Sequence, residues 1–317
     1  MTRALYVIQA SPLTTLQDGG RRGYQRFGVP VAGAMDRTAF AIANRLVGNA
    51  PDTAAIEIAV TGARLRCGGG AITVAVAGAA GLTIDGVAQG SWRSAVLHRG
   101  QTATVLPERD GMFGYVAVAG GFDLPPVFGS LSTHLRSGIG PFDGAALKTG
   151  DVLPVGPDAT DQPTRYLPEP PVREKRPTIR VVLGPQDDFF DDRTRARLIE
   201  APYRIGRQSD RMGFRLEGQA LATRGAANII SEGIAPGSIQ VPGDGQPIVL
   251  MADRQTVGGY PKIATVISCD MDILAQGRPG TEIQFKAVSL ADAIEARRHH
   301  RDRLAAIDSQ LLPIQTA

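Results

Sequence analysis

The sequence has 317 residues, 43% of them hydrophobic and 21% charged, which is usual for a soluble globular protein with room for two domains. The formal net charge is only +3 and charges of both signs are mixed along the chain, which argues against nucleic-acid binding. Apolar stretches are short and broken by glycine, and the first ten residues lack the apolar core of a signal peptide, so we expect a cytoplasmic protein without a membrane span.

Strand and turn signals dominate the first half of the chain. Residues 3–10 predict a strand, and the Gly-rich segment 11–36 predicts a long shaped loop, a kind of segment that often carries function. Asp36 is expected to cap a helix that stops at Gly48. From residue 54 to about 155 the hydrophobic period is two, which predicts a series of short strands in a sandwich or barrel.

A Pro-rich segment then separates the first half from a second run of strands, in which a helix is expected at about residues 189–200. The last helix is expected to begin at a Ser289 cap. The predicted domains are, in order, an N-terminal β domain (1–160), a linker (161–177), a C-terminal β domain (178–290) and a helical tail (291–317).

Several familiar site motifs are missing. The two cysteines, Cys67 and Cys269, lie in or beside strands and have no zinc-ligand spacing, so we interpret them as small buried side chains and expect no metal. The sequence has no GxxxxGK[ST], HExxH or GxSxG motif. It also lacks a Met-Lys-Met hairpin, so we do not expect the chain to carry its own biotin.

The loop of residues 122–144 places His134 and Arg136 two positions apart. In an extended segment both side chains point to the same side. A cation beside a proton-transfer group can hold an anion or polarise a carbonyl group. The alternative is a loop imidazole that bonds to a backbone carbonyl, and the sequence leaves both interpretations open.

Residues 231–266 concentrate polar side chains on Gly-rich turns. They are Gln240, Asp244, Gln246, Asp253, Arg254, Gln255, Tyr260 and Lys262. A glutamine can both donate to and accept from a urea-like group, and a lysine or arginine can stabilise an oxyanion. The Gly258–Gly259 pair would let a ligand approach the backbone closely. Polar residues that merely decorate surface turns are the competing interpretation.

A third polar segment, residues 184–190, lies before the predicted helix of the second half. Its Asp187 and Asp188 suit a helix N-terminus without any metal. Arg211, in a Ser-Asp-Arg-Met-Gly turn, is the better candidate for a ligand contact.

Four segments resemble signatures of the allophanate-hydrolase-subunit-2 family, also called the KipA or biotin-dependent carboxyltransferase family. They are residues 11–36, 120–144, 210–218 and 238–266. The resemblance covers about residues 4–290 and implies a mainly β fold of two cyclophilin-like β-barrel domains with a few short helices. The family pattern falls on Asp18, Arg21, His134, Arg136, Arg211, Gln240, Asp244, Gln246, Asp253, Gln255, Tyr260 and Lys262.

The resemblance implies a subunit of an ATP-dependent 5-oxoprolinase, which opens the 5-oxoproline lactam to glutamate. Its partners would be a smaller KipI-type subunit and a LamB/YcsF-type subunit, and ATP would be used through the complex. One alternative is a carboxyltransferase subunit that moves CO2 from carboxybiotin, on a separate carrier, to urea or a related amide. Another is a regulatory protein that binds a kinase inhibitor.

These implied functions assign two groups of residues. The expected catalytic residues are His134, Arg136, Asp253 and Lys262. The expected substrate-binding residues are Arg211, Gln240, Asp244, Gln246, Gln255 and Tyr260.

Overall fold

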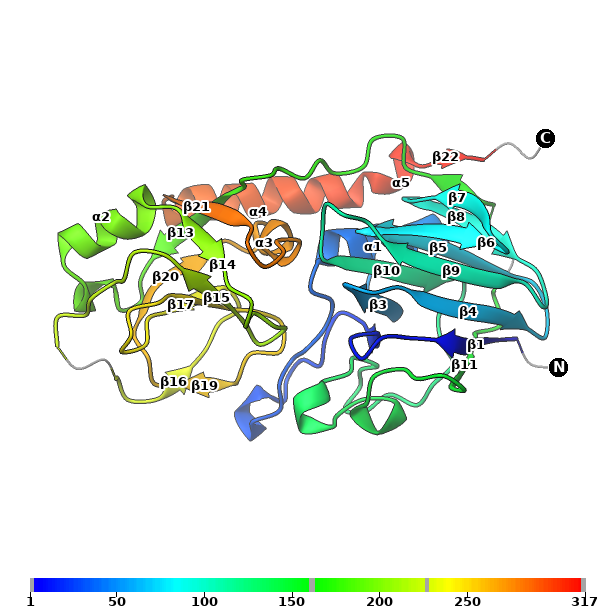
Figure 1. The fold of residues 1–317 in the computed structure, drawn as a ribbon, viewed down its shortest axis with the longest axis horizontal. Coiled ribbons are helices and arrows are strands. Elements are labelled where there is room, and N and C mark those ends of the chain that lie inside the picture. Colours follow the sequence, from blue (N-terminus) through cyan, green and yellow to red (C-terminus); the bar gives the residue numbers. More distant parts are fainter. Residues whose placement is uncertain (1–2, 160–162, 226–227, 315–317) are drawn as a thin grey trace. The chain divides into compact units, whose positions relative to one another are not determined.

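The computed structural model describes residues 3–159, 163–225 and 228–314, and it confirms the predicted mainly β fold (Figure 1). The chain forms two compact units. The first comprises residues 1–21, 32–172 and 303–317, and the second comprises residues 22–31 and 173–302. The chain passes from one unit to the other at residues 21–22, 31–32, 172–173 and 302–303, and the third of these passages falls within the predicted linker, of which residues 161 and 162 lie outside the described residues. No helix in the described ranges is long and apolar enough to cross a membrane.

The strands of the first unit are β1 (Ala4–Gln9), β2 (Thr15–Gln17), β3 (Ala55–Ala59), β4 (Ala63–Gly68), β5 (Ile72–Gly78), β6 (Ala80–Ile84), β7 (Val87–Gly90), β8 (Arg93–Leu97), β9 (Thr102–Pro107), β10 (Phe113–Val118), β11 (Val152–Pro154), β12 (Arg165–Tyr166) and β22 (Leu312–Pro313). In the described residues they form two antiparallel sheets, in the orders β11-β1-β4-β9-β6-β7 and β2-β3-β10-β5-β8-β12-β22. The first unit is therefore a pair of sheets, which fits the sandwich alternative predicted for its short strands, and the closed barrel is found in the second unit.

The core of the first unit lies between these sheets. Strand β4 alternates buried and exposed residues, so one face of it is covered, and Leu65 and Cys67 point into the core. All of β5 is buried, because its second face is covered by α1 (Arg37–Leu46). The predicted cap of this helix is confirmed, since Asp36 Oδ1 accepts from Ala39 N at 2.9 Å.

The second unit is a closed barrel. Its strands are β13 (Thr178–Leu183), β14 (Tyr203–Ile205), β15 (Gly213–Glu217), β17 (Ser238–Gln240), β18 (Ile248–Leu250), β20 (Lys262–Val266) and β21 (Glu282–Ala287), in the order β13-β20-β17-β18-β15-β14-β21. Strands β13 and β21 pair in parallel, and the other neighbours pair antiparallel. A separate ribbon joins β16 (Glu232–Gly233) to β19 (Val257–Gly258).

The helices follow their sequence signals closely. They are α2 (Asp192–Glu200), α3 (Met271–Ala275), α4 (Leu290–Ala305) and α5 (Ile307–Gln310), with single 3-10 turns η1 (Gln25–Phe27), η2 (Leu135–Ser137), η3 (Phe142–Gly144) and η4 (Asp187–Phe189). The predicted Ser289 cap of α4 is confirmed, because its Oγ accepts from Asp292 N and Asp292 accepts in return from Ser289 N. Helix α3 was not predicted.

Candidate functional site

A buried lysine on the barrel is the first feature of interest. Lys262 opens β20, its side chain is only 2% exposed, and its Nζ lies 2.7 Å from Glu232 Oε1. The same carboxylate oxygen accepts from Gln186 Nε2 at 2.8 Å. Hydrogen bonds from Lys262 and Gln186 lower the pKa of Glu232, which is therefore ionised at neutral pH. The group is a buried cation held by one carboxylate.

Gln240 lies directly opposite this lysine. A register shift between Ile239 and Gln240 pairs Gln240 with Lys262 across β17 and β20. Residues that face each other in an antiparallel pair present their side chains on the same side of the sheet. Gln240 is 2% exposed, and its Nε2 is buried without a hydrogen-bond partner among the described residues. This amide is a donor that can serve a ligand.

The β16–β19 ribbon covers this donor. Glu232 pairs with Gly258 across the ribbon. A Cβ atom on Gly258 would lie 2.5 Å from Ile234 Cδ1, 2.8 Å from Gln240 Nε2 and 3.4 Å from Gln255 Nε2, so the backbone of Gly258 packs directly against the ends of these side chains. We call the following group of residues the lysine cluster: Lys262, Gln186, Gln240 and Glu232. Gly258 and Gln255 lie beside it.

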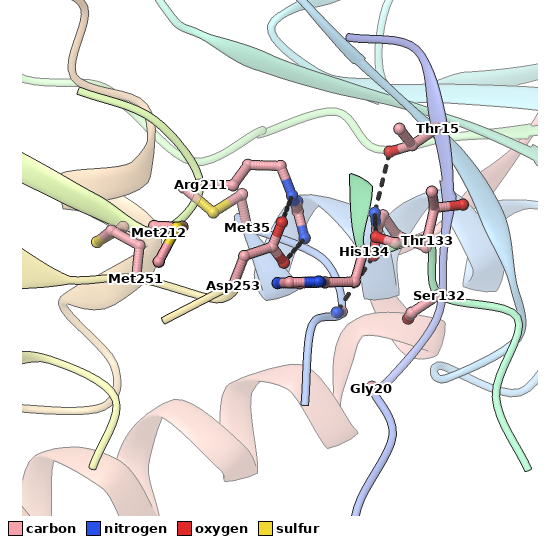
Figure 2. Close-up of polar contacts among 12 residues, drawn as sticks. Thr15, Gly20, Met35, Ser132, Thr133, His134, Arg211, Met212, Met251 and Asp253 are labelled. Carbon is pink, nitrogen blue, oxygen red and sulfur yellow. Dashed lines mark hydrogen bonds and ion pairs between the residues drawn. The ribbon is translucent and has the colours of Figure 1, made fainter. Parts of the chain in front are cut away.

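Arg211 and Asp253 form a two-bond ion pair, which Figure 2 shows as a pair of dashed lines. Arg211 Nε lies 2.9 Å from Asp253 Oδ2, and the second guanidinium nitrogen lies 2.8 Å from Oδ1. Asp253 N also donates to Arg211 O at 2.8 Å. The pair joins the turn before β15 to the loop after β18. Because each charge is the other's partner, the arrangement suits a rigid positioning element.

The remaining predicted residues of the barrel are more exposed. Asp244 Oδ1 accepts from Gln246 N at 3.0 Å, and the Gln246 amide bonds to both backbone groups of Gly218 at 3.1 and 3.3 Å. These contacts hold the turn between β17 and β18, and neither side chain bonds to Lys262 in the described structure. Tyr260 is 40% exposed.

The expected geometry of His134 and Arg136 is wrong. His134 is buried and caps η2, where its Nδ1 accepts from Ser137 N at 3.2 Å, whereas Arg136 lies within that turn and is exposed. A 3-10 turn has three residues, so positions two apart point in different directions. Acceptance at Nδ1 places the proton of the neutral imidazole on Nε2. Figure 2 shows His134 beside Thr133 and Ser132.

Asp18 and Arg21 hold this histidine loop in place. The Asp18 carboxylate accepts from Gly20 N, Leu131 N and the hydroxyls of Ser130 and Ser132. Arg21 is fully buried and donates to the carbonyls of residues 127 and 132 at 3.0 and 2.6 Å. The two family-pattern residues therefore tie segment 11–36 to segment 122–144.

Sequence reasoning missed two members of the lysine cluster, Glu232 and Gln186. Both lie inside segments that were selected for their polarity, but nothing in their own neighbourhood distinguishes them. Their contacts with Lys262 connect residues that are far apart in the chain. These contacts can be identified only once the pairing of the strands is known.

Comparison with known proteins identifies a matching family model and several relatives. Residues 27–287 match the family model of the carboxyltransferase domain, subdomain A and B. The chain is 40% identical to the C subunit of the 5-oxoprolinase of Escherichia coli over 295 residues, which cover 93% of this chain and 94% of that protein. It is 31% identical to urea amidolyase of Saccharomyces cerevisiae, over 87% of this chain but 16% of that protein.

A structural comparison agrees. The crystal structure of the Kluyveromyces lactis urea carboxylase superimposes with a TM-score of 0.88 at 27% identity, over 98% of this chain and 30% of that chain. The family resemblance read from the sequence is confirmed by these matches. The chain therefore belongs to the family defined by the carboxyltransferase domain, subdomains A and B.

Proposed function

We propose that this chain is a subunit of an ATP-dependent 5-oxoprolinase complex, which opens the lactam of 5-oxoproline to glutamate. The observation that carries the proposal is the match to the E. coli 5-oxoprolinase protein, which extends over nearly the whole of both chains. The yeast urea amidolyase, in contrast, is matched over only 16% of its length.

The lysine cluster supplies the chemistry that lactam opening needs. Hydrolysis adds the hydroxyl of water to the carbonyl carbon and a proton to the ring nitrogen as the C–N bond breaks. The carbonyl oxygen becomes negative on the way. The Lys262 ammonium and the Gln240 amide are buried donors, and donors in a desolvated site stabilise such an oxyanion strongly. Gln255 lies beside them and is assigned to substrate binding.

The other predicted residues receive supporting roles. His134 presents Nε2–H for proton transfer, and Arg136 offers an exposed positive charge. The pair of Arg211 and Asp253 is assigned to positioning, because each neutralises the other. Tyr260 is exposed and is assigned to a substrate contact.

Asp244 and Gln246 are assigned to the shape of the turn between β17 and β18. Their contacts with each other and with Gly218 support this role. A substrate contact of the Gln246 amide would have to replace both of its bonds to Gly218.

Assembly with a smaller KipI-type subunit and a LamB/YcsF-type subunit is part of the proposal, with ATP used by the assembled complex. Co-expression of the three chains followed by size-exclusion chromatography should yield one joint peak. That peak should release ADP and glutamate only when 5-oxoproline is present. Separate elution at micromolar concentration, or ATP hydrolysis that ignores 5-oxoproline, would contradict the proposal.

Carboxyl transfer to urea or a related amide is the second candidate. The family model and the similarity to K. lactis urea carboxylase favour it. The buried Gln240 Nε2 would donate to the ureido oxygen of carboxybiotin on a separate carrier, and the carboxyl group of that cofactor would supply CO2. The same complex given urea and a carboxylated biotin carrier would then form allophanate. Turnover of urea without turnover of 5-oxoproline would establish this candidate in place of the first.

A further inference from the structure

The barrel offers three donors in the lysine cluster. Gln186 is fixed to β20 by two bonds, from its N to Lys262 O at 3.0 Å and from Lys262 N to its Oε1 at 3.1 Å. Its Nε2 therefore projects from a rigid position, next to Lys262 Nζ. Gln240 Nε2 is the third donor, and a buried N–H without an acceptor costs about 1–3 kcal/mol. This set of donors is suited to an anionic group with more than one oxygen.

The acceptor that occupies two of these three donors, those of Lys262 and Gln186, comes from outside the barrel. Glu232 belongs to the β16–β19 ribbon, and a single oxygen of its carboxylate takes both the lysine and the Gln186 bond. Its side chain is 44% exposed, although Lys262 is 2% exposed. The anion is therefore half in solvent while the cation is buried. Burial of an ammonium group is unfavourable unless a partner compensates its charge.

The ribbon that carries Glu232 is short and weakly covered. Each of its strands has two residues, Val257 within it is 55% exposed, and Ile230, just before it, is 93% exposed. Segments with few buried apolar contacts have the lowest free energies of local opening. Gly258 of this ribbon lies against Gln240 Nε2, so lifting the ribbon uncovers the unpartnered donor and frees Lys262 together.

We propose that Lys262, Gln186 and Gln240 form a binding site for an oxygen anion of the substrate, and that Glu232 is the resident anion, displaced with its ribbon when substrate enters. The inference rests on the proposed function and names the residue that controls access to its site. The incoming anion is the carboxylate of the lactam substrate or the oxyanion that develops on its carbonyl. Either group presents negatively charged oxygen that can accept hydrogen bonds from these three donors.

Access to Lys262 is measured first, in the isolated chain and without any turnover. Acetylation of lysines by an N-hydroxysuccinimide ester, followed by mass spectrometry, reports the reaction rate of each amine. Glu232→Gln should speed acetylation of Lys262 by about tenfold, because loss of one charge-assisted bond favours the open ribbon. Saturating 5-oxoproline should slow that reaction again. Lys286, which is exposed on β21, should react equally in both proteins.

Two further measurements separate the sources of the anion. Isothermal titration with 5-oxoproline and with 2-pyrrolidinone, the lactam without a carboxylate, compares the wild-type chain with Glu232→Gln. Tighter binding of 5-oxoproline alone assigns the site to the carboxylate. Unchanged binding of both, with a higher kcat in the assembled complex, assigns it to the oxyanion.

The proposal is overturned if Glu232→Gln leaves Lys262 as unreactive as in the wild type, or if 5-oxoproline binding and kcat both fall. Glu232→Ala provides a second variant in case the glutamine keeps the ribbon closed. A complex that shows no 5-oxoprolinase activity would refute the proposed function, yet the acetylation result would still decide whether Glu232 controls access to Lys262.

Discussion

The ion pair of Arg211 and Asp253 allows positioning to be tested separately from catalysis. We consider Asp253→Asn, which keeps the shape of the side chain but removes its charge. The Arg211 side chain is 12% exposed and that of Asp253 is 8% exposed, so the guanidinium would remain buried beside a neutral amide. Removal of one partner from a buried pair costs about 3–5 kcal/mol. The residual exposure favours the lower limit.

That cost can be expressed as a melting temperature. A loss of about 3 kcal/mol, at about 3 °C per kcal/mol for a domain of this size, lowers the Tm of the barrel by about 10 °C. Thermal unfolding followed by circular dichroism measures it. Asp244→Asn is the matched control, because Asp244 is exposed on a turn and its replacement should shift the Tm by little.

A double variant tests the reasoning further. Replacement of Arg211 and Asp253 together by leucine removes both charges of the pair, so the double variant should be more stable than Asp253→Asn alone. A Tm for Asp253→Asn within about 2 °C of the wild type would refute the assigned role. Loss of turnover in the assembled complex at an unchanged Tm would show instead that Asp253 takes part in the chemistry.

Four other outcomes follow from the structure. His134→Ala in the reconstituted complex should lower kcat by roughly 10²-fold or more. His134→Asn should lower kcat equally, although its side chain can still accept the hydrogen bond that caps η2. Wild-type rates in both variants would assign His134 a structural role. Lys262→Ala should lower kcat more than it raises KM, because a cation aimed at an oxyanion acts mainly in the transition state, and steady-state kinetics with 5-oxoproline would detect the opposite pattern. Cys67 and Cys269 should react slowly with iodoacetamide at neutral pH until the protein is unfolded, because burial raises the pKa of both thiols, and rapid labelling of the native chain would contradict this. The pKa of Glu232 is lowered in the folded protein, so its ionised carboxylate stabilises the fold above the unfolded pKa of about 4.3. This stabilisation is lost as the pH falls through the folded pKa. The urea midpoint of unfolding, measured at decreasing pH, should therefore fall less in Glu232→Gln than in the wild type.

Some features depend on residues that are neighbours in the chain, and the sequence alone determined these. Asp36 and Ser289 were identified as helix caps because the cap and the amide it accepts from are three residues apart. The alternation along β4 predicted both a strand and the burial of Cys67. The polar density of residues 231–266 likewise selected the segment that contains Lys262 and Gln240.

The tertiary structure decided which of these polar residues meet. The contact between Lys262 and Glu232 depends on a ribbon outside the barrel, and the position of Gln240 depends on a register shift between β17 and β20. Neither contact leaves a local signal in the sequence. Both depend on which strands lie next to each other in the sheet, and the sequence alone does not show that order. The separation of His134 from Arg136 has the same origin: the loop closes on itself through the backbone bonds of His134 with residue 139, and this turn overrides the extended spacing.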